Sequence, residues 1–398
     1  MRALTQQAFT LSSNFRADES IELLEPVYQA IDDPTTVEEV ALALEFARAL
    51  MLHKRYDRSI EISDRVVGRA EEVLPPAQVI DGLITRATAI HRTRRIEGLS
   101  LLAGLVQMAD EHDLPAQALR ALNNHEYALM MDAPGIPLER IDDFLERARR
   151  LGSAAWLNRA LLDSAFMYAI DHGDIARGEA LLDEAESYAL NDLERSQARM
   201  TRAHLSVVQD PDATDIGLMF EEAASWADAT DAQMQGMHHS MLSWSMVLDG
   251  DFAGGLEHSL QVSISGGLFG ATFSALGLGD AESLDAARRH VDSIASGRRV
   301  GEACTLLLDA GASALAGSTD EAAALFIEAI ALLERIADPF TVTLARAMFS
   351  GRVADAHPAA VEAGRGARTW LRTAGFRRWE VLLEDFLPPM ESAASESA

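Results

Sequence analysis

Residues 318–340 read STDEAAALFIEAIALLERIADPF, and this stretch predicts a helix with a polar start, an apolar face and a sharp end. Ser318 or Thr319 can cap the first turn, where the positive end of the helix dipole also favours the two acidic residues that follow. Apolar side chains then recur at three- to four-residue spacing, which places them on one face of the helix. Pro339 ends the helix because it has no backbone N–H to donate.

The same arrangement recurs along almost the whole chain, with a period of roughly forty residues. Turns between helices, each followed by an apolar or small residue, lie near Tyr56, Ile96, Pro137, Ile175, Thr214, Phe252, Ala281, Thr319 and His357. A period in this range is typical of arrays in which each helical hairpin buries its apolar face only against its neighbours. We therefore predict an all-α fold, a right-handed α-α superhelix of about nine helical-hairpin repeats. An opening helix is expected near residues 18–31. The predicted outer helices include 138–151, 281–295 and 358–374, and the predicted inner helices include 154–171 and 299–315.

No change in composition marks a domain boundary, so we expect one solenoid over residues 1–388. Residues 376–388 predict a C-terminal helix that caps the open apolar end of the array. Residues 389–398 are small and polar, and they predict a disordered tail. One step of the repeat is short, between Phe252 and Ala281, and it contains GGLFGATFSALGLG at 266–279. Its glycines indicate close backbone packing, a flexible hinge or a bend that contacts a ligand.

Composition limits the possible partners. The 398 residues carry a net charge of −28, and such a field repels phosphate backbones and anionic lipid. We therefore expect no direct nucleic-acid binding and no membrane binding. Cys304 is the only cysteine and the first twenty residues lack an apolar signal core, so we expect a cytoplasmic protein without disulfides.

Motifs of enzymes and metal sites are missing or broken. Lys54 is the only lysine, which excludes a phosphate-binding GxxxxGK[ST] loop. DDFLE at 142–146 matches one metal motif of terpene synthases, but its required companion fails at 191–199. DPDATDIGLMFE at 210–221 resembles a calcium loop, yet Asp215 stands where the sharp turn needs glycine. We predict no catalytic residues, no metal ligands and no cofactor.

The chain resembles tetratricopeptide repeat proteins in GDIARGEALLDEA, GDFAGGLEHSL and residues 318–340. In that family a turn, an apolar anchor and a small residue three positions later let two helices pack closely, and here Ile175 with Gly178 and Phe252 with Gly255 match. The last repeats, from LLERIADPFTVTLARAMF onward, are similar to repeat arrays of actinobacterial regulators. Those arrays are attached to ATPase, nucleotide-cyclase or LuxR-type DNA-binding modules, which implies a signalling or transcriptional role. This sequence shows the motifs of none of these modules and looks like the array alone, so the resemblance implies an attached or neighbouring module.

The resemblance implies that the first helix of each pair lines a groove that holds a peptide or a partner helix. Polar and aromatic residues on those helices are the candidate contacts, because arginine and aromatic side chains dominate interface energetics. They are Asn124, His125, Tyr127, Asp163, Tyr168, Arg199, Arg202, His238 and Trp244. The predicted function is a non-catalytic scaffold for a protein or peptide partner. The alternative is a metabolite sensor with its pocket near residues 266–279. The partner's identity and the oligomeric state stay open.

Overall fold

The computed structural model describes residues 1–13, 16–130, 132–189, 191–225, 232–262, 265–295 and 297–388, which form helices and turns with no strand among them. Two compact units divide the chain. The first unit comprises Met1–Met130, Glu139–Trp156 and Ser225–His238, and the second comprises Met131–Leu138, Leu157–Ala224 and His239–Ala398. Two helices, α9 (Ala154–Phe166) and α13 (Ala232–Leu248), cross the division between the units by more than one residue.

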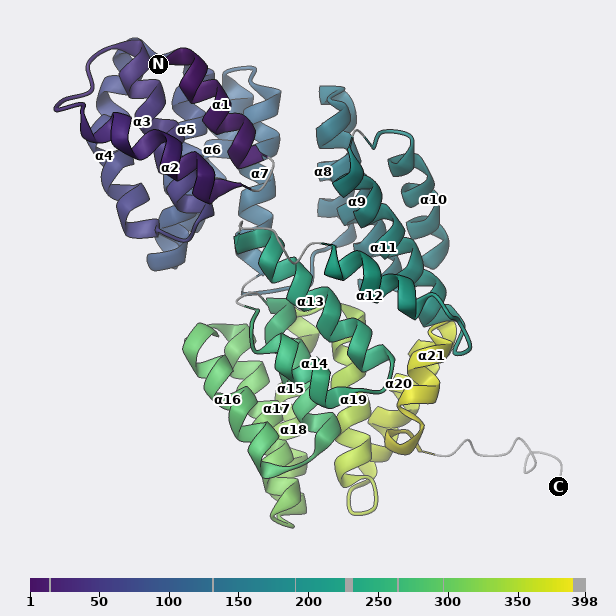
Figure 1. The fold of residues 1–398 in the computed structure, drawn as a ribbon. Coiled ribbons are helices and arrows are strands. Elements are labelled where there is room, and N and C mark those ends of the chain that lie inside the picture. The colour runs from purple at the N-terminus through teal and green to yellow at the C-terminus, as the bar shows by residue number, and fades with distance from the viewer. Residues whose placement is uncertain are drawn as a thin grey trace, which may run out of the picture. The chain divides into compact units, whose positions relative to one another are not determined.

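The first unit is a series of helices, and the first seven of them pack against one another in chain order, each antiparallel to the next. They are α1 (Arg2–Ser13), α2 (Ala17–Gln29), α3 (Val37–Leu52), α4 (Tyr56–Val73), α5 (Pro76–Thr93), α6 (Arg95–Glu111), α7 (Pro115–Met130) and α8 (Leu138–Leu151). Because α3 packs on α5 and α5 on α7, these three helices form one layer (Figure 1). Helices α4 and α6 pack between them from the other side, and buried apolar side chains such as Phe46 and Leu102 lie between the layers.

The second unit repeats this plan. Its helices are η1 (Met167–Asp171), α10 (Ile175–Glu186), α11 (Asp192–Gln209), α12 (Ile216–Ala224), α14 (Phe252–Ser259), α15 (Ser265–Leu278), α16 (Ala281–Ala295), α17 (Arg299–Leu315), α18 (Thr319–Ile336), α19 (Pro339–Val353), α20 (Pro358–Ala374), α21 (Arg377–Leu382) and η2 (Glu384–Phe386). Each of α15, α17 and α19 packs on the next, with α16 and α18 alongside. The predicted all-α fold of successive helical hairpins is confirmed.

Local signals explain why the helices begin and end where they do. Thr36 caps α3 in a capping box, in which its hydroxyl accepts a hydrogen bond from Glu39 N at 3.3 Å and Glu39 Oε2 accepts one from Thr36 N at 2.9 Å. Asp338 caps α19 by accepting from Thr341 N at 2.7 Å. Gly250, with φ of 87°, closes the reversal between α13 and α14 in the left-handed conformation that glycine adopts without strain.

Three observations differ from the predicted helices. Helix α1 precedes the helix predicted near residues 18–31, and it packs on both α2 and α3. The inner helix predicted through residue 171 changes to a π-helix at Met167. The predicted capping helix is short, because α21 ends at Leu382 and a 3-10 turn follows. The predicted tail, residues 389–398, lies outside the described residues.

The glycine-rich segment forms a regular helix, α15, and its glycines serve close packing. A Cβ on Gly270 would lie 2.3 Å from Ser259 Oγ, and one on Gly277 would lie 2.5 Å from the Phe252 ring. Leu268 and Phe273 in the same helix are buried. Of the three possibilities that the sequence left open, the structure shows close packing at Gly270 and Gly277.

The C-terminal helices pack against much earlier parts of the second unit. Arg378 Nε donates to Leu248 O at 2.6 Å, and its Nη1 donates to Pro211 O at 3.0 Å. The buried Trp379 ring packs edge-on against Trp244 and Phe340, with ring centres 6.0 and 5.3 Å away. The C-terminal helices therefore bond to segments that lie 130 and 167 positions earlier in the chain, and they do more than cover the last repeat.

Candidate functional site on the inner helices of the first unit

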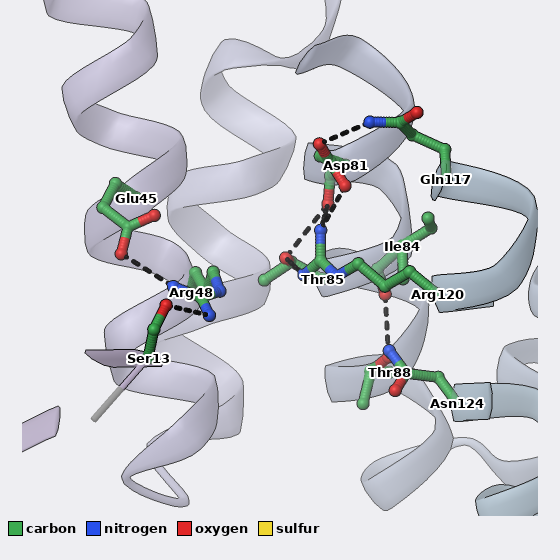
Figure 2. Close-up of polar contacts among 10 residues, drawn as sticks. All are labelled: Ser13, Glu45, Arg48, Asp81, Ile84, Thr85, Thr88, Gln117, Arg120 and Asn124. Atoms are coloured by element: carbon green, nitrogen blue, oxygen red, sulfur yellow. Dashed lines mark hydrogen bonds and ion pairs between the residues drawn. The ribbon is translucent and has the colours of Figure 1, made fainter. Parts of the chain in front are cut away.

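The layer formed by α3, α5 and α7 carries a row of polar side chains that we call the polar ladder. It consists of Glu45 and Arg48 on α3; Asp81, Thr85, Thr88 and Arg92 on α5; and Gln117, Arg120, Asn124 and Tyr127 on α7. Spacings of three and four residues within each helix keep these side chains on one face. Figure 2 shows Arg120 and Gln117 of α7 pointing toward Asp81 of α5, and, on α3, Glu45 pointing toward Arg48.

Arg120 joins α7 to α5. Its Nη1 donates to Asp81 Oδ1 at 2.7 Å and to Asp81 O at 3.0 Å, and its Nη2 donates to Thr85 Oγ1 at 2.9 Å (Figure 2). A planar guanidinium suits this use, because its donors form a rigid fork that one carboxylate and nearby oxygens can satisfy together. The side chain of Arg120 is 20% exposed and that of Asp81 is 39% exposed, so the pair is reachable from solvent.

Two side-chain amides lie on either side of Arg120 along α7. Gln117 Nε2 donates to Asp81 Oδ2 at 3.1 Å, and Asn124 Nδ2 donates to Thr88 Oγ1 at 3.2 Å. Both bonds join positions 36 residues apart, so successive repeats are in register here. An amide has two N–H donors and one carbonyl acceptor, and these contacts use one donor of each. Among the described residues, no protein group bonds the side-chain carbonyl of the half-buried Gln117.

Glu45 and Arg48 form the end of the ladder on α3. Arg48 Nη1 donates to Glu45 Oε1 at 3.1 Å, and the Arg48 guanidinium lies 4.8 Å from the centre of the exposed Phe9 ring. Burial raises the pKa of the Glu45 carboxyl, against the opposing effect of Arg48. Burial lowers the pKa of Arg48, and the positive charge of Arg120 lowers it further. Arg48 and Arg120 therefore influence each other on this face, although each lies beside its own carboxylate, Glu45 and Asp81.

Arg92 ends the ladder on α5 between two aromatic rings. Its guanidinium lies 6.0 Å from the centre of the Tyr56 ring and 5.5 Å from that of Tyr127. Cation–π attraction at these distances orients the guanidinium without neutralising its charge. Within the part of the chain that the structure describes, Arg92 forms no ion pair with a carboxylate. Its charge is therefore available to a ligand.

The predicted contact residues on α7 belong to this site or adjoin it. Asn124 and Tyr127 are ladder members. His125 lies beside the ladder, where its Nδ1 is 3.4 Å from Glu126 Oε1, and Glu126 also pairs with Arg140 of α8. Three of the four predicted residues of the first unit therefore lie on α7, at or beside the ladder, whereas the fourth, His238, lies on α13.

The predicted residues of the second unit lie on α9, η1, α11 and α13. The Asp163 side chain lies beside Arg159 and is 45% exposed. Partial removal from water raises the pKa of its carboxyl, against the opposing effect of Arg159. Tyr168 is buried, with the Arg177 guanidinium 5.6 Å from its ring centre. Burial places Tyr168 in the packing of the unit rather than on a surface that a partner reaches.

The remaining predicted residues are engaged within the protein. Arg199 pairs with Glu222, and Arg202 donates to Asp183 at 2.9 Å and Glu186 at 2.8 Å. Trp244 packs against Trp379 and Phe340 as described above. His238 is half-buried on α13, where the two units divide. We therefore take the polar ladder of the first unit as the candidate site.

Eight ladder residues were absent from the residues predicted from the sequence: Glu45, Arg48, Asp81, Thr85, Thr88, Arg92, Gln117 and Arg120. A signal for them exists, because Glu45, Asp81 and Gln117 follow one another at intervals of 36 residues, the separation that the Gln117–Asp81 bond spans. Polar residues that recur in this register on the inner helices would have indicated a continuous face.

The two acidic motifs have structural partners. Asp143 of DDFLE accepts from Arg147 Nε at 3.0 Å, and Asp215 accepts from Ser206 Oγ at 2.6 Å. Over the described ranges, no three His, Cys, Asp or Glu side chains converge as ligands for a metal ion. No helix in those ranges combines the length and the apolar character needed to cross a membrane.

Comparison with known proteins adds little to this picture. No family model matches the sequence, and no curated protein matches it. Among solved structures, the chain is similar to the crystal structure of yeast Tom70 at 11% sequence identity and a TM-score of 0.32. The match covers 96% of this chain and 88% of that chain. At such a TM-score the likeness supports no inference, and the chain's own helix packing carries the fold.

Proposed function

We propose that this protein is a non-catalytic helical-repeat scaffold that binds a protein or peptide along the polar ladder. The observation that carries the proposal is the register of the ladder, in which side chains 36 residues apart bond between the parallel helices α5 and α7. An extended peptide presents a donor and an acceptor at every residue, and side-chain amides such as Gln117 and Asn124 can satisfy both.

The resemblance to actinobacterial regulators favours a role in signalling or transcriptional regulation in the cytoplasm. On this proposal the scaffold responds to a partner and acts on an attached or neighbouring ATPase, cyclase or DNA-binding module. Reading the genes beside this one for such a module tests that finer part separately from the binding itself.

Photocross-linking tests the binding proposal. Gln117 on the ladder and Gln107 on α6 are each replaced by p-benzoyl-phenylalanine in the full chain; Gln107 is exposed and bonds only to Glu111 of its own helix. We expect a partner protein or peptide to cross-link at position 117 and not at position 107. Equal cross-linking at both positions, or none at either, would overturn the proposal.

A further inference from the structure

One end of the first unit carries a basic surface that the composition conceals. The turn between α3 and α4 presents Lys54 and Arg55, both exposed. Arg92 in the last turn of α5, Arg94 between the helices and Arg95 at the start of α6 surround the next turn at this end. We call these five residues the basic corner.

Two contacts place both turns at the same end of the unit. Helix α3 packs beside α5 in parallel register, because a Cβ on Gly82 would meet the Leu44 side chain at 2.9 Å, 38 positions earlier. At the ends of these helices, Arg92 lies over the ring of Tyr56, the residue that follows Arg55. The left-handed conformation of Lys54, with φ of 62°, reverses the chain there and leaves its side chain exposed.

The corner carries more positive than negative charge. Its five cations face two acidic residues on the same turns, Asp57 and Glu97. Glu97 pairs with Arg94 at 2.9 Å, with both side chains about half exposed, and such exposed pairs neutralise little. Arg58, one helical turn further on, is paired with Glu25 at 2.7 Å. In a protein of net charge −28, this is a local reversal of sign.

An apolar side chain stands in the middle of these charges. Ile96 follows Arg95 and is 71% exposed, more than the other exposed large apolar residues of the described chain. Phosphates and sugars give such a side chain nothing to pack against, whereas an apolar side chain of a protein partner does. Apolar contact enclosed by complementary charge is typical of protein recognition sites.

We infer that the basic corner binds an acidic segment of the partner, in which an apolar side chain packs on Ile96 beside aspartate or glutamate residues. This inference rests on the proposed function, because it names the chemistry of the peptide that the ladder holds. Arg92 belongs to both surfaces, so a segment that leaves the ladder along α5 arrives at the corner. A duplex is disfavoured because its charges, one per about 1.7 Å, would continue onto the acidic remainder of the surface.

Panning a random library of twelve-residue peptides on the full chain tests the inference. We expect enriched peptides to be acidic with at least one Leu, Ile or Phe. Fluorescence anisotropy then compares their affinity for the wild type with their affinity for the corner variant, Lys54→Glu/Arg55→Glu. Both residues are exposed, and no carboxylate among the described residues pairs with them, so the variant keeps its fold. Arg149→Glu/Arg150→Glu at the end of α8 is the control with the same change in net charge.

Lys54→Glu/Arg55→Glu should lower the affinity for the peptides at least fivefold, and Arg149→Glu/Arg150→Glu should lower it less than twofold. Ile96→Ser should also lower the affinity measurably, without a change in melting temperature. Enriched peptides that are neutral or basic and insensitive to the corner variant, but lost in Arg120→Ala, would overturn the inference and leave the proposed function standing. No enrichment at all would contradict both. Duplex DNA or anionic vesicles that bind the corner in place of acidic peptides would also overturn the inference.

Discussion

The guanidinium of Arg92 lies 5.5 Å from the centre of the Tyr127 ring, so the last turn of α5 is held to the last turn of α7. Tyr127 was predicted from the sequence as a contact residue, whereas Arg92 was not. It also fixes a positive charge at the point where the polar ladder meets the basic corner. The electrostatics of the face therefore depend on an aromatic ring as much as on its ion pairs.

Removing the ring should loosen this connection. Tyr127→Leu keeps apolar bulk but loses the cation–π attraction, so we expect a loss of about 0.5–1 kcal/mol in the free energy of unfolding. Tyr127→Phe keeps the ring face and should behave like the wild type. Urea unfolding of the three proteins measures the difference, and equal losses in both variants would show that the ring face contributes nothing.

The surroundings of two helical glycines predict opposite effects on stability when each is changed to alanine. Gly270→Ala places a Cβ against the buried Ser259 Oγ, which is bonded to Ser243 Oγ, and should destabilise the protein by about 1–3 kcal/mol. Gly68→Ala on α4 meets nothing within 4 Å and should stabilise it by about 0.5–1 kcal/mol, because alanine favours helix. Thermal melting of both variants checks the prediction; stabilisation by Gly270→Ala would contradict the observed packing.

His204 should make the protein sensitive to mild acid. Burial lowers its pKa to about 4, from an ordinary value of 6.5. Above pH 6.5 the ring is neutral in both the folded and unfolded states. Below that pH the unfolded chain takes up a proton that the folded chain refuses, so stability falls as pH drops toward 4, by about 1.4 kcal/mol per pH unit.

His204→Phe keeps the edge-on ring contact with Phe166 but cannot bind a proton. Unfolding free energies at pH 7.5 and pH 5.0 should therefore fall by about 2 kcal/mol more for the wild type than for this variant. The difference isolates His204 from the carboxyl groups that titrate in both proteins. An identical fall in the two proteins would show that His204 titrates as an ordinary exposed histidine.

Arg378 should stabilise the return of the C-terminal helices. Arg378→Ala leaves the carbonyl groups of Leu248 and Pro211 without this donor, at a cost of about 1–3 kcal/mol. The adjacent Arg377 is exposed, and Arg377→Ala should change stability little. Differential scanning fluorimetry compares the two, and similar melting temperatures would contradict the bonding role of Arg378.

Helix bounds could be predicted closely because their signals are local. The predicted helices 138–151, 281–295, 299–315 and 358–374 match the observed ones at both ends. Glycine turns, caps and prolines mark those ends within a few residues of sequence. Helix α1 was missed because its stretch RALTQQAFTLSS has a weak apolar stripe, and it is held by packing on α2 and α3 instead.

Long-range arrangements could not be predicted in the same way. Nothing near Arg378 indicates that its acceptors lie 130 and 167 positions earlier. Trp244 looked like a binding residue for the same reason, because its packing partners Phe340 and Trp379 are distant in sequence. The ladder is an intermediate case, since its 36-residue register is visible in the sequence once the parallel inner helices are known.

Binding of a partner peptide to ladder variants tests most directly whether the α3–α5–α7 face is the functional site. Calorimetry would compare the wild type with Arg120→Ala/Asn124→Ala and with Gln107→Ala on α6, using a peptide captured at position 117. We predict a loss of at least tenfold in affinity for the ladder variant and unchanged affinity for the control. Full affinity in a folded ladder variant would contradict the assignment of the site.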